Sequence, residues 1–318
     1  MSKSFLTVLF LSLASAFAGA AAAEPDKEAF LSLAQKGWVY ELRSSVLRRD
    51  ASMPPVRLDS KKIAQGSVCL IGEKPHNETR ATLATFDRLL RNIFNRSEGF
   101  LSSGADASAC GPAQTYIRLY SGRPPFIAYN RDLRWIDETF DIGLPKDRDH
   151  RIFSPAQAIT YFGRKGTAVY LLVKQPRGPE PSELERRFYR SILTEELFQA
   201  FSFGVDILVF EPTGPFLSKI QETPVNLRHM NWNDPRYMEG MLSSNPGGLC
   251  EFDLFMLHAL ARTRLTSSNS PAFLQYISDR FTDLEEMAHR TLADGIADEI
   301  VDPECGHMPG FAGLDTRK

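Results

Sequence analysis

The sequence predicts an α+β domain, with a sheet in the N-terminal half and a mostly helical C-terminal half. Strand candidates, which are short apolar or alternating segments, occur between residues 66 and 175. From residue 182 onward, apolar side chains recur at the spacing of helices. The elements show no regular strand and helix alternation, which favours α+β over a doubly wound parallel sheet.

The chain of 318 residues opens with a segment typical of a secretory signal peptide, predicted for residues 1–23. Lys3 precedes an apolar run at residues 5–17, and three alanines end the segment. The run is shorter than the about 20 residues that a membrane span needs. We therefore expect an exported protein, periplasmic or extracellular, with no membrane span in the mature chain.

Charge and cysteine content narrow the class of protein further. The net charge of -2 gives no reason to expect nucleic acid or an anionic membrane as a partner. The cysteines form an even set without a C-x-x-C spacing, which favours two disulfides in an oxidising compartment. Three pairings are possible, and free buried thiols are the alternative. Proximity in the chain weakly favours Cys69 with Cys110 and Cys250 with Cys305.

The N-terminal half begins with a predicted helical arm over residues 24–50, which Pro54 and Pro55 end. The main domain is expected over residues 51–301. Its first half carries six predicted elements: a strand at 66–72, an amphipathic helix at 78–94, strands starting at Thr115 and Pro125, a short helix at 155–162 and a buried strand at 166–175.

The C-terminal half begins with a capping box, Ser182 followed by Glu185, which predicts the start of a helix of about 20 residues. Gly204 is expected to end that helix. Residues 222–249 are rich in Pro, Asn and Gly and are expected to form a loop. Helices are predicted at 251–263 and 271–292, followed by an irregular tail at 302–318.

A polar pentad lies inside the helix that follows the capping box. Residues 195–199 read EELFQ, which has the spacing of the zinc-protease motif H-E-x-x-H without its histidines. At 100° per residue, Glu195 and Gln199 continue the apolar face of Phe188 and Ile192. A carboxylate on the inward face must find a partner or lose its charge. Glu196 lies a quarter turn away, where an active enzyme would hold its general base.

The pentad is poorly suited to zinc. A hydrolytic zinc site needs three protein ligands, and the neutral amide of Gln199 is a poor one. A third ligand would have to be Asp206 or a distant histidine such as His258, and nothing in the sequence brings either close. We therefore expect no metal and no cofactor. The alternative is structural: Glu195 and Gln199 bond to each other or to backbone and fix the helix in the core.

The segment EELFQAFSFGVD at residues 195–206, with the preceding GTAVYLLVKQ and the later FDLFMLHALARTRL, resembles an exported bacterial family, domain-of-unknown-function family 2927. The resemblance implies a zincin-like fold without a full set of zinc ligands. It implies that Glu195 and Gln199 stand at the histidine positions, that Glu196 stands at the catalytic position, and that Asp206 matches the family's aspartate. Ser202 replaces a glycine of the family, and Gly204 is expected to supply the turn.

Three functions remain open from the sequence. The first is a non-catalytic protein whose cleft, with Glu195, Gln199 and Asp206 as binding residues, holds a peptide or cell-envelope protein. The alternative is a metallopeptidase with unusual ligands and Glu196 as general base. A third is a carbohydrate hydrolase with paired carboxylates. Trp232 and Tyr237 are compatible with sugar or peptide binding, although such residues more often anchor a loop.

Overall fold

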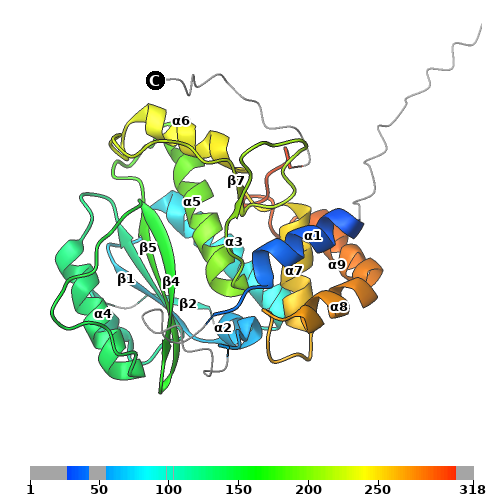
Figure 1. Cartoon of the computed structure of the whole chain (residues 1–318). Helices are drawn as coiled ribbons and strands as arrows, with labels where there is room; N and C mark the ends of the chain where they lie inside the picture. Colours follow the sequence, from blue (N-terminus) through cyan, green and yellow to red (C-terminus); the bar gives the residue numbers. More distant parts are fainter. Residues whose placement is uncertain (1–26, 43–54, 98, 103, 306–318) are drawn as a thin grey trace, which may run out of the picture.

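The computed structural model describes residues 27–42, 55–97, 99–102 and 104–305 (Figure 1). The predicted signal peptide lies outside these residues, as do most of the second half of the predicted arm and residues 306–318 of the predicted tail.

A five-stranded sheet forms the centre of the larger, sheet-containing part of the molecule (Figure 1). Its strands lie in the order β2, β1, β3, β5, β4. Four are parallel to one another: β1 (Val68–Gly72), β2 (Phe100–Ser102), β3 (Thr115–Tyr120) and β5 (Gly166–Lys174). Strand β4 (Ala156–Gly163) pairs antiparallel with β5 and is the end strand of the sheet.

Helices cover both faces of this sheet, which explains why all of β3 and most of β5 are buried. Helix α4 (Phe126–Phe140) packs on one face against Tyr116 and Tyr120 of β3. On the other face, Ile117 and Leu119 join the core that includes α3 (Asn77–Phe94) and α5 (Glu183–Ser202). Alternate residues of one strand thus enter two different cores.

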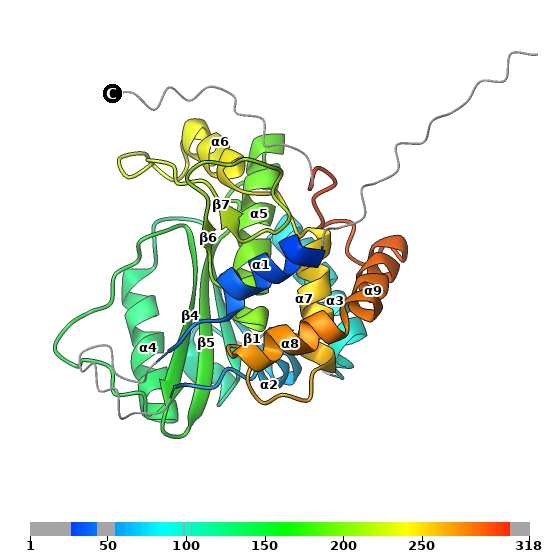
Figure 2. The same cartoon turned by 45° about the vertical axis from the view of Figure 1, so that its right-hand side comes forward.

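The C-terminal part adds helices beside α5 and α3 (Figure 2). Their bounds are Pro235–Ser244 (α6), Glu251–Arg262 (α7), Pro271–Asp279 (α8) and Phe281–Ala293 (α9). A short parallel pair, β6 (Ile207–Leu208) and β7 (Gln221–Glu222), lies between α5 and α6 in the chain. The remaining elements are α2 (Ser60–Gln65) and a 3-10 turn at Ala107–Cys110.

Helix α1 (Lys27–Trp38) lies across α7 and α8 (Figure 2). Phe30 and Trp38 are both buried, and the Phe30 ring meets the Phe252 ring edge-on at 5.0 Å. Residues 39–42 are not helical. The first helix is therefore shorter than the predicted arm, and its apolar face is part of the main core instead of an appendage.

Four local predictions are wrong. The segment starting at Pro125 is the first turn of α4, because its alternating pattern also fits the apolar stripe of a helix. The predicted helix at 155–162 is strand β4, because pairing with β5 outweighs local propensity. The predicted loop at 222–249 contains α6. The predicted helix at 271–292 is interrupted at Arg280, where α8 ends and α9 begins.

The mixed α and β class is confirmed, and so are strands β1 and β5 and helix α3. Both disulfides form in the weakly favoured pairing, Cys69 with Cys110 and Cys250 with Cys305. The expected division into a sheet half and a helical half is not confirmed, because α1 to α4 also lie in the first half. Within the described residues, every helix is too short or too polar to cross a membrane.

Candidate functional site

Helix α5 positions the three polar side chains of the pentad. The predicted capping box is present, since the Ser182 hydroxyl accepts from the Glu185 N–H and the Glu185 carboxylate accepts from the Ser182 N–H. The helix ends at Ser202, and Phe203 adopts the left-handed conformation with φ 59°. Gly204 therefore does not form the cap. A Cβ atom at this position would lie 2.8 Å from the Trp38 ring. The backbone therefore packs so closely against the ring that only glycine fits without a shift.

Glu195 has a buried partner that the sequence did not reveal. The Lys219 Nζ lies 3.1 Å from the Glu195 Oε2, with the Lys219 side chain fully buried and the Glu195 side chain 15% exposed. The Asn245 amide also donates to Glu195 Oε2 at 2.8 Å. The inward carboxylate thus keeps a cationic partner, as the charge on that helix face requires.

The protons of the Lys219 ammonium also have neutral acceptors. Its Nζ donates to the Ser191 hydroxyl at 3.0 Å, to Asn245 Oδ1 at 3.0 Å and to the Pro246 carbonyl at 2.7 Å. A buried charge is tolerated only when it is paired and hydrogen-bonded. This lysine meets both conditions, so it is an internal cation of the site.

Asp253, at the start of α7, holds the segment that carries Lys219. Its side chain is fully buried and accepts from the backbone N–H groups of Lys219 and Cys250, both at 2.8 Å, and from the Ser218 hydroxyl. Burial raises the pKa of Asp253 to about 6, and these donors oppose the rise. An acidic residue three positions after Cys250 at a helix start is the signal in the sequence that could have predicted this role.

Glu196 points toward the end strand β4. Its carboxylate accepts from the Ala158 N–H. Although the residue as a whole is only half-buried, protein atoms surround the carboxyl group, and this desolvation raises the pKa of Glu196 well above its usual range. The charges of Glu195 and Asp206 raise it further, and Lys219 opposes them.

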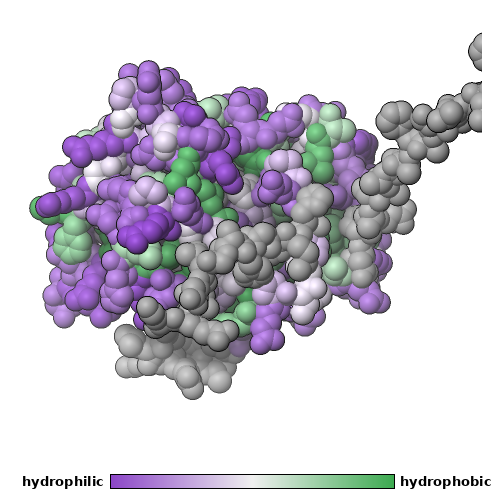
Figure 3. Space-filling model, turned by 90° about the horizontal axis from the view of Figure 1, so that it is seen from above, coloured by the Kyte–Doolittle hydropathy of each residue, from purple (hydrophilic) through white to green (hydrophobic). Residues whose placement is uncertain are grey.

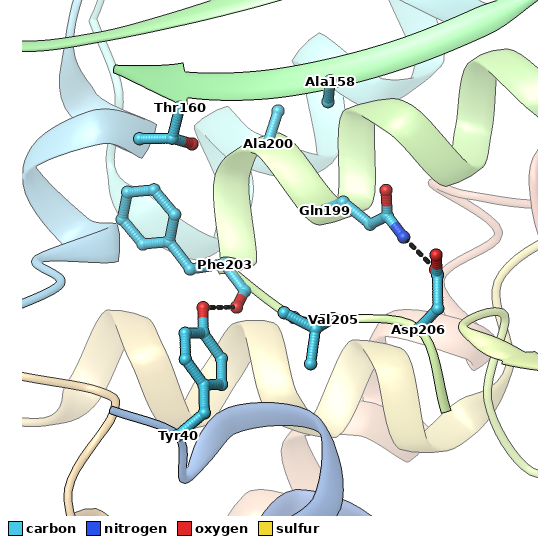
Figure 4. A pocket seen from close by; sticks show the side chains of 9 residues that line it. Tyr40, Ala158, Thr160, Gln199, Ala200, Phe203, Val205 and Asp206 are labelled. Carbon is cyan, nitrogen blue, oxygen red and sulfur yellow. Dashed lines mark hydrogen bonds between the residues drawn. The ribbon is translucent and has the colours of Figure 1, made fainter. Parts of the chain in front are cut away.

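Gln199 and Asp206 lie together at a cavity of about 220 Å³ between α5 and β4 (Figure 4). The Gln199 amide donates to Asp206 Oδ1. Tyr40 enters from the segment after α1 and donates to the Phe203 carbonyl at 2.5 Å. Desolvation and the Glu195 charge raise the pKa of Asp206 to about 6, although the Asp206 residue is exposed at the cavity rim, where water moderates the shift.

The structure thus brings the four predicted residues together, each with its own partner. Glu195 and Gln199 do not hydrogen-bond to each other, so the prediction of a mutual bond is wrong. Glu195 pairs with Lys219 instead, and Gln199 donates to Asp206. Glu222 of β7 joins the same group of charges, and desolvation followed by Asp206 and Glu195 raises its pKa to about 7.

The other candidates have structural roles. His258 is buried, and its Nε2 lies 2.8 Å from the Thr291 hydroxyl. Tyr237 is buried in α6 and meets the Phe188 ring edge-on. Trp232 is partly buried and packs on the main core. Each anchors an element to the core, which matches the structural interpretation of these residues.

The side chains of Glu195, Gln199 and Asp206 do not form a set of ligands that fits zinc. In the part of the chain that the structure describes, no three His, Cys, Asp or Glu side chains converge in an arrangement that could hold a metal ion. The Lys219 ammonium takes the position beside Glu195 that a cation would need, and Gln199 offers its N–H to Asp206. Zinc would have to displace both contacts.

Comparison with known proteins returned no matching family model, no matching curated protein and no matching solved structure.

Proposed function

We propose that this chain is an exported, non-catalytic protein of zincin-like fold, related to family 2927, whose cleft between α5 and β4 binds a peptide or cell-envelope partner. The pairing of the buried Lys219 ammonium with Glu195 carries the proposal. A carboxylate that already has an internal cation does not need a metal ion. Without a Lewis acid, a glutamate supplies only general-base assistance to an attacking water.

Two observations support the zincin-like and exported parts of the proposal. The E-E-x-x-Q helix packs beside an antiparallel end strand, so that Glu196 of α5 reaches the backbone of β4 at Ala158. Two disulfides are typical of proteins in oxidising compartments, as the signal-peptide prediction requires.

The free edge of β4 supports binding of an extended peptide. The Lys174 N–H donates to the Pro155 carbonyl, so alternate backbone groups from 155 onward face β5. The backbone groups of Ala158 and Thr160 therefore face away from β5, beside the cavity that both residues line. The Glu196 carboxylate occupies the Ala158 N–H, which leaves the Thr160 N–H and the two carbonyls for a partner strand. An extended segment that pairs with this edge would add a strand to the sheet.

The test uses the mature chain with both disulfides. We expect a displayed random decapeptide library to yield binders. Thr160→Pro, which removes an outward N–H, should weaken binding, whereas Thr160→Val, which keeps the N–H, should not. Equilibrium dialysis against zinc chloride should leave less than one ion per chain. One tightly held zinc per chain, with peptide cleavage lost on chelation, would refute the proposal.

The second candidate is a metallopeptidase with non-standard ligands. The upward shift of the Glu196 pKa favours it, since a carboxylate with a raised pKa is a stronger base. This candidate requires chelator-sensitive cleavage of a peptide library that Glu196→Gln abolishes. Unchanged cleavage in that variant, or no cleavage by the wild-type chain, would exclude it.

A further inference from the structure

The cavity beside β4 has a distinctive chemistry. Asp206 is the charged residue among those that line it, and the Gln199 amide lies next to that carboxylate (Figure 4). The aromatic side chains of Tyr40 and Phe203 form another part of the wall. A volume of about 220 Å³ is enough for one long side chain but not for a folded partner. The cavity therefore combines an anionic end with apolar and aromatic walls.

Negative charge exceeds positive charge around this cavity. The charge of Glu195 raises the pKa of Glu196, Asp206 and Glu222, and the charge of Asp206 adds to the rise at Glu196 and Glu222. In the described part of the chain, Lys219 is the cation that opposes these shifts. That ammonium is already held by Glu195 and three neutral acceptors. Asp206 is the carboxylate that lines the cavity, and among the described residues no basic side chain forms an ion pair with it. A cationic group that enters would therefore be stabilised.

The rim next to Asp206 exposes apolar side chains. Val205, Leu208 and Phe210 are 39%, 52% and 74% exposed. Leu208 pairs with Glu222 across the short β6 and β7 sheet, so this apolar group borders the carboxylates. Seen from above, most of the visible surface is hydrophilic and its hydrophobic areas are small (Figure 3). Grouped exposed apolar residues of this kind often mark a contact surface.

We propose that the cavity receives the side chain of a lysine or arginine from the bound peptide, with Asp206 as the carboxylate that pairs with it. The inference rests on the proposed function, since the basic residue belongs to the segment that pairs with β4. Glu222 adds negative charge behind Asp206. Tyr40 and Phe203 contact the aliphatic stem, and apolar residues next to the basic one cover Leu208 and Phe210.

The experiment compares matched peptides on the mature, disulfide-bonded chain. A peptide from the library selection is synthesised with its basic residue intact and with norleucine in its place. We expect the norleucine peptide to bind about tenfold more weakly or worse, the effect of losing a charge-assisted contact. Asp206→Asn and Glu222→Gln should reduce this difference. Glu138→Gln, an exposed residue of α4 on the opposite face of the sheet, should leave it unchanged.

The outcomes distinguish failure of the basic-residue inference from failure of peptide binding itself. Equal affinity of the lysine and norleucine peptides, or selected peptides without basic residues, would overturn this inference and leave peptide binding at β4 intact. No peptide binding at all would overturn both. A difference that Asp206→Asn abolishes while the norleucine affinity stays the same supports both.

Discussion

The ammonium of Lys219 and the carboxylate of Glu195 lie 3.1 Å apart, in a site where the lysine side chain is fully buried. The two residues come from different elements: Glu195 from α5, and Lys219 from the segment between β6 and β7. The Asp253 carboxylate fixes that segment through the Lys219 N–H. The site therefore depends on contacts among α5, α7 and the β6 to β7 segment.

Removing the internal cation should destabilise the fold. Lys219→Met leaves the Glu195 carboxylate without its cation, and the loss of one member of a buried pair costs about 3 to 5 kcal/mol. The measurement is the free energy of unfolding in urea. The double variant Lys219→Met with Glu195→Gln should recover part of this loss, because no unpaired charge remains.

Lys61→Met, at an exposed position of α2, is the matched control and should change the free energy of unfolding by less than about 0.5 kcal/mol. A Lys219→Met variant as stable as this control would show that the pair does not hold the site together.

The stability contributed by the protonated carboxyl groups should be lost as the pH rises toward and through neutrality. The folded-state pKa values of Glu196 and Glu222 lie above their ordinary value of 4.5, so the folded chain holds protons that the unfolded chain has already lost. Between the ordinary pKa of 4.5 and the folded-state pKa, which is about 7 for Glu222, their contribution to the free energy of unfolding therefore decreases as the pH rises. Asp253 acts in the same sense between its ordinary pKa of 3.8 and its folded-state pKa of about 6.

Glu222→Gln should flatten this pH dependence in urea unfolding. His258 acts in the opposite sense at lower pH, because burial lowers its pKa to about 4 and the unfolded chain then binds the extra proton. The comparison is therefore the difference between the wild-type chain and the variant at each pH, in which the His258 contribution cancels. An identical pH dependence in the two proteins would contradict the upward shift of the Glu222 pKa.

Gly204 should not tolerate a side chain. A Cβ atom would lie 2.8 Å and 3.1 Å from two atoms of the buried Trp38 ring. Overpacking of this kind costs about 1 to 3 kcal/mol, so Gly204→Ala should lower the urea midpoint. At Gly178 a Cβ would meet nothing within 4 Å, and Gly178→Ala should change stability little. Equal stabilities of the two variants would refute the close-approach role.

The Cys250–Cys305 disulfide should stabilise the fold through the chain segment it closes. Its cysteines are 55 residues apart, and a loop of that length corresponds to about 4 kcal/mol in the chain-entropy model. Replacing both cysteines by serine should lower the free energy of unfolding by up to this amount. Fluorescence-monitored unfolding of the oxidised wild type and the variant provides the measurement. An unchanged urea midpoint would contradict the prediction.

The sequence by itself determined the features that depend on neighbouring residues. Ser182 and Glu185 predicted the start of α5, because a capping box needs only residues three positions apart. The mostly apolar run at 166–175 predicted β5, since a strand that is buried on both faces carries apolar side chains at successive positions. The helical period also placed Glu195 on the inward face and Glu196 a quarter turn away.

Only the tertiary structure decided the partners of those residues. Lys219 and Asp253 come to the site through chain segments distant from the pentad, and no local period encodes such a meeting. Residues 156–163 form strand β4 because they pair with β5 through a ladder of hydrogen bonds. Local sequence propensity does not include such pairing. Local geometry fixes which way a side chain points, whereas the packing of whole elements fixes what it meets.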